Sequence, residues 1–319
     1  MTFILGITIG PAVVGMAIAF AVWFLRRRTS IWLEDAAAGF SVAAALTCLL
    51  GALALRLIDV MPLFGVSVAP VVQLWEPYDR FTIPLVLTLA ALVFAIFPVR
   101  RGGSIAGMSG SAPGAAASGS AGPSPFRRVF ADASTRAVAA PLVVLVIVVA
   151  ITIAAGAASD PETGFTQFTV SVGDDMSIGA PIYGWRSSLP ALAVIALVLA
   201  TAFTALITMS RPSPGHDYLA EARVRRRRTG NISLLVTGGL LAHLAMVLFS
   251  LSRTASLGGS FTTPEGLVSA RADFAELAPA LQWIALGVDA AAFACWASVA
   301  LTAVPGSSST TTSTRNSYS

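Results

Sequence analysis

The chain has 319 residues, of which 55% are hydrophobic and only 11% are charged, and its mean hydropathy is +0.79. A soluble domain carries about 25% charged residues, so this composition excludes a disordered chain, a collagen, a disulfide scaffold and an ordinary cytosolic enzyme. It predicts an all-α membrane protein that crosses the bilayer several times.

All 20 basic residues are arginine, and the chain contains no lysine. A Schiff base with retinal or pyridoxal phosphate is therefore excluded, because it needs a lysine amine. The two cysteines, Cys48 and Cys295, lie in apolar stretches, which is typical of small buried hydrophobic residues.

The first apolar stretch has neither a preceding basic region nor a cleavage site, and Arg26, Arg27 and Arg28 follow it. This arrangement predicts an uncleaved membrane helix rather than a signal peptide. A membrane-spanning helix needs about 20 mostly apolar residues. Seven stretches meet that requirement and predict a seven-transmembrane-helix bundle: 4–25, 36–58, 81–99, 137–158, 188–209, 231–251 and 280–303.

The distribution of arginine sets the expected orientation, because short cytoplasmic loops retain positive charge. With the N-terminus outside and the C-terminus in the cytoplasm, fifteen of the 20 arginines lie on the inner side. Ten of the 16 acidic residues lie outside. The net charge of +4 is then the sum of two opposed faces, so it does not indicate nucleic-acid binding. The outer arginines are Arg56, Arg80, Arg186, Arg253 and Arg271.

Two segments lack the composition of a packed core. Residues 100–136 are rich in Gly, Ser and Ala, which predicts a flexible cytoplasmic linker between helices 1–3 (residues 1–99) and helices 4–7 (residues 137–304). The Ser/Thr-rich residues 305–319 predict a disordered cytoplasmic tail.

The cytoplasmic loop 210–230 is expected to hold a short helix over 218–223, followed by four consecutive arginines: Arg225, Arg226, Arg227 and Arg228. Arginines beside a membrane attract anionic lipid by about 1 kcal/mol each. Membrane lipids are therefore expected partners of this run. The alternative is that the run only keeps the loop inside.

Two outer segments are more than simple connections. Residues 60–75 are apolar but are interrupted by prolines, which suits an interfacial or re-entrant segment better than a full span. Residues 159–187 contain an alternating run, a turn-prone Gly173-Asp174-Asp175 and a second apolar patch. This pattern predicts a small extracytoplasmic hairpin. Either segment forms a structural cap or the entrance for a substrate.

Ionisable side chains are costly within a membrane, so each one is a candidate for function. Two stand out: His243 in the sixth span and Asp289 in the seventh. Consecutive antiparallel helices are usually neighbours, and both residues are expected at a similar depth. The pair forms either a proton relay or a polar contact between helices that fixes their packing, and a protonated Asp289 bonded to a backbone carbonyl is a third alternative.

Recognisable catalytic sets are missing from the sequence. One membrane aspartate is too few for an intramembrane aspartyl protease, and the GxSG string at Ser109 lies in the flexible linker. The sequence has no cluster with metal-ligand spacing and no P-loop or dinucleotide fingerprint. We therefore expect no catalytic residues, no metal and no cofactor.

The stretch Pro181-Ile182-Tyr183-Gly184-Trp185, a following span, and then Ser210-Arg211-Pro212 before the arginine run resemble uncharacterised actinobacterial multi-pass integral membrane proteins. The resemblance implies a location in a bacterial plasma membrane and no activity.

Three functions are compatible with these features of the sequence. The first is a non-enzymatic envelope or assembly component that meets another envelope protein through its outer loops. The second is a small-solute or proton-coupled transporter that uses Asp289 and His243. The third is an enzyme that acts on a lipid-linked envelope substrate.

Overall fold

The structure is a computed structural model that describes residues 2–26, 35–64, 79–96, 135–171, 177–209, 218–263 and 266–304. Seven α-helices lie in these ranges: α1 Thr2–Arg26, α2 Asp35–Val60, α4 Ile83–Ile96, α6 Thr135–Ala157, α7 Trp185–Met209, α8 Tyr218–Ala255 and α9 Ala278–Leu301. Three short 3-10 helices accompany them: η1 Met61–Phe64, η2 Asp79–Phe81 and η3 Ala275–Leu277. Four strands complete the described chain: β1 Gln167–Ser171, β2 Ser177–Pro181, β3 Gly258–Thr263 and β4 Gly266–Arg271.

Six of the helices are long and apolar enough to cross a membrane, which confirms the helical, membrane-type fold. In the predicted third span, the structure describes a helix of 14 residues, α4, and the residues after Ile96 lie outside the described part of the chain. At a rise of 1.5 Å per residue this described part is about 21 Å long, against the roughly 30 Å hydrocarbon core of a bilayer. Seven full spans and the orientation with the N-terminus outside stay predictions.

Large apolar side chains point away from the bundle on its outer helices. Leu25 on α1 is 80% exposed and Val146 on α6 is 67% exposed, and many Val, Ile, Leu and Phe residues of these helices are similarly uncovered. Exposing such a surface to water would cost free energy, whereas lipid chains are as apolar as the side chains themselves. The outward faces therefore agree with the membrane-type composition.

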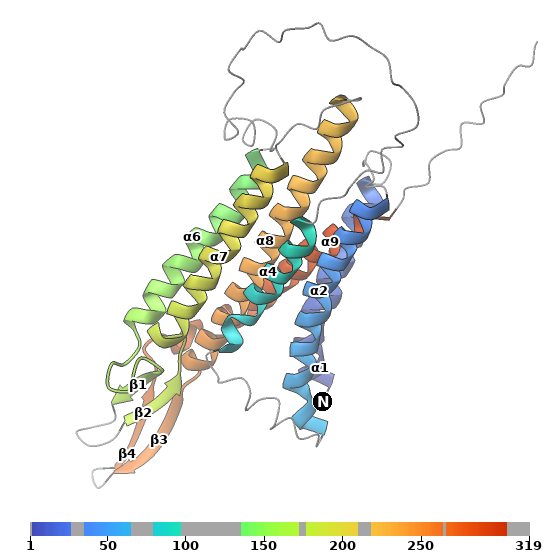
Figure 1. Ribbon diagram of the computed structural model, residues 1–319. Coiled ribbons are helices and arrows are strands. Elements are labelled where there is room, and N and C mark those ends of the chain that lie inside the picture. Colours follow the sequence, from blue (N-terminus) through green and yellow to red (C-terminus); the bar gives the residue numbers. More distant parts are fainter. Residues whose placement is uncertain are drawn as a thin grey trace, which may run out of the picture.

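The longest helix, α8, is the centre of the bundle. In its apolar stretch 72% of the residues are buried, against 17–44% in the other five candidate spans. It contacts α4, α6, α7 and α9, while α1 and α2 pack on α9. Figure 1 shows α8 running between these groups, with its first turns extending beyond the neighbouring helices.

The expected break before the sixth span is wrong. The predicted loop 210–230 and the short helix 218–223 are replaced, from Tyr218 onward, by one continuous helix of 38 residues. The arginine run has good helix formers on its N-terminal side and no proline or helix-ending turn on its C-terminal side. The helix consequently passes through the four arginines and carries them on α8 itself.

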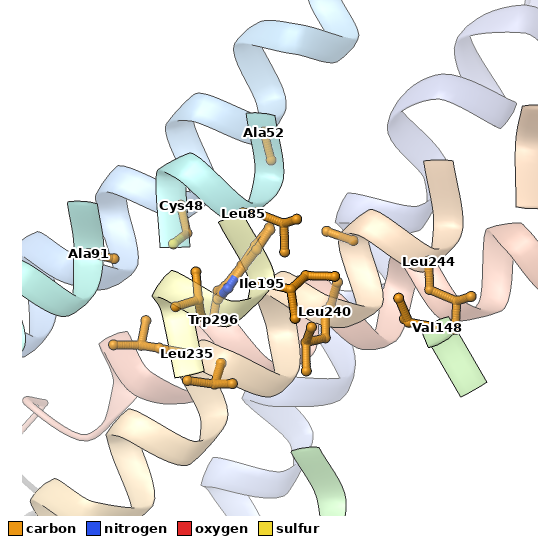
Figure 2. Close-up of a cluster of buried hydrophobic side chains, with 14 of the residues drawn as sticks. Cys48, Ala52, Leu85, Ala91, Val148, Ile195, Leu235, Leu240, Leu244 and Trp296 are labelled. Atoms are coloured by element: carbon orange, nitrogen blue, oxygen red, sulfur yellow. The ribbon is translucent and has the colours of Figure 1, made fainter. Parts of the chain in front are cut away.

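Close packing around α8 depends on two adjacent glycines. A Cβ atom on Gly238 would lie 2.5 Å from Nε1 of Trp296 on α9, and one on Gly239 would overlap Thr88 of α4. Trp296 is fully buried, and Figure 2 shows it among Leu235, Leu240 and Ile195. The glycines thus admit α9 and α4 on neighbouring sides of the central helix, as small residues do in membrane bundles.

Two antiparallel hairpins lie at the end of the bundle where α7 begins and α8 ends, which we call the hairpin end (Figure 1). The hairpin expected within 159–187 is confirmed, since β1 pairs with β2 from Gln167–Pro181 to Ser171–Ser177. The second hairpin, β3–β4, was not predicted, so an all-α description of the chain is incomplete. The opposite end, which carries Arg225–Arg228, is called the arginine end.

Several predicted segments lie outside the described residues. These are the linker up to residue 134, the tail from residue 305, the turn at 173–175 and most of the segment 60–75. The linker and the tail therefore stay predictions, as does the re-entrant segment.

Candidate functional site: the buried polar contacts of α8 and α9

His243 lies on α8 and is completely buried. Its Nδ1 atom is 2.7 Å from the backbone oxygen of Phe81 in η2, and its Nε2 atom is 3.3 Å from the hydroxyl of Tyr183. A carbonyl only accepts hydrogen bonds, so Nδ1 donates, and Nε2 of the neutral ring accepts from Tyr183. Both ring nitrogens are thus used within the protein.

His243 and its two partners form aromatic contacts as well. The rings of Phe81 and Tyr183 are edge to face with centroids 4.8 Å apart, and Tyr183 meets the imidazole in the same manner at 5.7 Å. Tyr183 lies just before α7, outside the apolar spans, and burial raises its pKa to about 12. Its hydroxyl therefore keeps its proton at neutral pH and can donate it to His243.

The Phe81 contact has a structural reason. This carbonyl lies just before α4 and has no partner in the first turn of that helix, where Leu85 and Val86 donate to Thr82 instead. A buried carbonyl without a donor costs free energy comparable to a lost hydrogen bond, and His243 supplies the donor. At the other end of α4, Arg228 donates from Nη2 to the Ala95 oxygen at 3.1 Å.

Two residues of α8 therefore hold both ends of the described part of α4. His243 and Arg228 are 15 positions apart, or about 22 Å along a helix, which matches the length of the short antiparallel helix. Cations near a helix C-terminus also interact favourably with its dipole. These two contacts anchor α4 to the central helix of the bundle.

Asp289 lies on α9 and forms an ion pair with Arg56 of α2, with 2.8 Å between Nη2 and Oδ2. The Asp289 side chain is 3% exposed and that of Arg56 is 20% exposed. The guanidinium also lies 5.4 Å from the ring centre of Phe249 on α8, within range of a cation–π interaction. One contact thus joins α2, α8 and α9.

More positive charge gathers at the hairpin end. Burial lowers the pKa of Arg80 in η2, and the positive charges of Arg253 and Arg56 lower it further. Arg253 is exposed and lies one helical turn beyond Phe249, on the same face of α8. Arg80 and Arg253 consequently add positive charge near the Arg56–Asp289 ion pair.

The predicted polar pair is not joined by a hydrogen bond or an ion pair in the described structure. His243 bonds to Phe81 and Tyr183, whereas Asp289 bonds to Arg56. The sequence reasoning missed Arg56 because it assigned this residue to the outer side. A signal was present, since Arg56 lies within the predicted span 36–58 and is therefore as costly there as Asp289.

The arginine run divides into different environments. Arg228 binds the end of α4, the side chain of Arg226 is exposed, and those of Arg225 and Arg227 are half-buried. At the same level, Asn231 donates to Ser41 of α2 at 3.2 Å and to Thr302 after α9 at 3.0 Å. The four arginines are therefore not equivalent, although the sequence treats them as one run.

The hairpins are tied to the helices and to each other. Thr254 on α8 donates to the Pro181 oxygen at the end of β2, and the rings of Phe168 and Phe274 meet at 5.3 Å. In the loop between α6 and β1, Asp160 accepts hydrogen bonds from the Glu162 amide and from the Thr169 hydroxyl. These contacts make a small, fixed surface at the hairpin end.

The chain has no match among protein-family models, curated proteins or solved structures.

Proposed function

We propose that the chain is a non-enzymatic component of a bacterial plasma membrane that presents its hairpin end to another envelope protein. The observation that carries this proposal is the pairing of both intramembrane polar side chains with structural partners. His243 anchors α4 and α7, and Asp289 joins α2 to α9. Their polar atoms are used in packing, as expected for polar contacts that fix a membrane bundle.

The shape of the hairpin end supports a binding role. Each strand of the two hairpins has one neighbour in its own two-stranded sheet, which leaves an edge to which an extended segment of another chain can add. Ser171 and Ser177 face each other across β1 and β2 and are both exposed. Fixed strands with accessible edges suit a partner contact better than a passage for solute.

The test is the size of the particle that holds the protein after extraction from its native membrane with a nanodisc-forming polymer. The wild-type chain is expected in a particle larger than its own 32.8 kDa plus lipid. A double variant, Ser171→Arg with Ser177→Arg, should release the chain from that particle, because the added side chains block the strand edge. Arg226→Gln, at the opposite end, serves as the matched control and should leave the particle unchanged.

A transporter is the main rival, and the Arg56–Asp289 ion pair is the feature that favours it. Transport requires water to reach Asp289. Labelling of Asp289→Cys by a membrane-impermeant thiol reagent, in a chain with Cys48→Ala and Cys295→Ala, measures that access. Rapid labelling, together with a proton flux in liposomes that Asp289→Asn abolishes, would replace our proposal with the transporter. Turnover of a lipid-linked substrate would instead support the enzyme.

A further inference from the structure

Arg227 differs from the other arginines of the run. Its side chain is half-buried, and its Nε atom is buried without a hydrogen-bond partner among the residues that the structure describes. The positive charge of Arg26 on α1 acts on the Arg227 guanidinium. A partly buried cation beside a like charge needs both an acceptor and a negative charge to be stable.

The surroundings of Arg227 give its place in the bundle. It lies four residues before Asn231, so both face the same side of α8, and Asn231 contacts α2 and the residue that follows α9. Arg26 is the last residue of α1, which packs on α9. Arg227 therefore lies at the arginine end, on the side of α8 that faces α2 and the end of α9, and near enough to Arg26 for the two charges to interact.

Apolar surface adjoins this pair of cations. Phe24 is 49% exposed and Leu25 is 80% exposed, directly before Arg26 at the end of α1. A cationic site beside exposed apolar side chains, at the end of a membrane-spanning helix, matches a phospholipid, which carries a phosphate above two acyl chains. A free phosphate ion would use only the cations.

We propose that Arg26 and Arg227 bind the phosphate of one anionic phospholipid, whose acyl chains lie along Phe24 and Leu25. The phosphate oxygens accept from the terminal nitrogens of the half-buried Arg227 guanidinium, and a planar guanidinium fits two such oxygens at once. The lipid also supplies the negative charge between two like charges. The expected orientation places this end in the cytoplasmic leaflet, where anionic lipids are abundant. This proposal does not depend on the partner of the hairpin end.

Native mass spectrometry of the purified full chain, titrated with phosphatidylglycerol or with phosphatidylcholine of the same acyl chains, tests the site. The wild-type protein should bind one phosphatidylglycerol at least about ten-fold more tightly than phosphatidylcholine, since hydrogen bonds between charged groups are strong. Arg227→Gln should remove this preference, and Arg227→Lys should restore only part of it. High salt should weaken it little, because partly buried charges are poorly screened.

Arg226→Gln is the matched control, because it removes the same charge from the exposed neighbour. It should lower the affinity by no more than about five-fold, the effect of one charge near an anionic surface. Thermal unfolding in phosphatidylcholine nanodiscs checks that Arg227→Gln is folded, and Arg26→Gln replaces it if it is not. Unchanged binding by the folded variant, or an equal loss in Arg226→Gln, would overturn the site. Release of the lipid by inorganic phosphate would overturn the assignment to a lipid.

Discussion

Replacing His243 by phenylalanine keeps an aromatic ring of similar size but removes both ring nitrogens. The Phe81 carbonyl then loses its donor and the Tyr183 hydroxyl loses its acceptor. Water cannot replace the imidazole at a side chain that is 0% exposed. Each buried polar group left without a partner costs about 1–3 kcal/mol, so we expect His243→Phe, which leaves two such groups, to lower the free energy of unfolding by about 2–6 kcal/mol.

Tyr183→Phe separates the two contacts. It removes only the longer hydrogen bond, 3.3 Å against 2.7 Å, and single polar contacts in membrane bundles average about 0.6 kcal/mol. We expect a loss of about 0.5–1 kcal/mol. In the His243→Phe background the same substitution should restore part of the lost stability, because it removes a hydroxyl that no longer has an acceptor.

The assay is reversible unfolding in mixed micelles with increasing SDS, followed by near-ultraviolet circular dichroism, for the wild type, both single variants and the double variant. His243→Asn is the partial rescue, since its amide can still donate toward Phe81. Our reasoning would be refuted if His243→Phe were as stable as the wild type. It would also be refuted if Tyr183→Phe alone cost as much as His243→Phe.

Three further predictions concern other contacts of the bundle. Asp289→Leu alone should lower the free energy of unfolding by about 3 kcal/mol, because it leaves the Arg56 cation partly buried and unpaired. Asp289→Leu combined with Arg56→Leu should be nearly neutral, and equal losses for the two variants in the SDS titration would contradict this. Gly238→Val should cost about 1–3 kcal/mol through overlap with Trp296, and a thermal midpoint equal to that of the wild type would contradict the close packing. Tyr183 stabilises the fold in its protonated form, so this contribution is complete below its ordinary pKa of 10.0 and is lost as the pH rises toward about 12. In Tyr183→Phe the stability should fall less between these pH values, which thermal unfolding across that range measures.

Much of the fold follows from composition and periodicity. Apolar stretches of membrane length predicted each helix, and the observed bounds of α1, α2, α6 and α9 lie within about two residues of the predicted ones. The hairpin in 159–187 was predictable because its alternating run has the period of a strand. The second hairpin was missed, since the glycine-rich start of β3 and its short polar residues give little alternation.

The polar contacts could be predicted only in part. The cost of burying a charge singled out His243 and Asp289, and each is buried against polar partners in the structure. Their partners lie far along the chain, since Arg56 is 233 residues from Asp289 and Phe81 is 162 residues from His243. A backbone carbonyl such as that of Phe81 also leaves no mark in the identity of its residue.

The sequence by itself determined that this is a bundle of apolar helices and which of its buried side chains require a polar partner, because the free energy of burial depends on residue type and local period. The tertiary structure decided which residues are those partners, made α8 the central helix and placed four consecutive arginines in different environments. The physical reason is that hydrogen bonds and ion pairs act over a few ångströms, so their partners are fixed only when helices distant in the chain pack together.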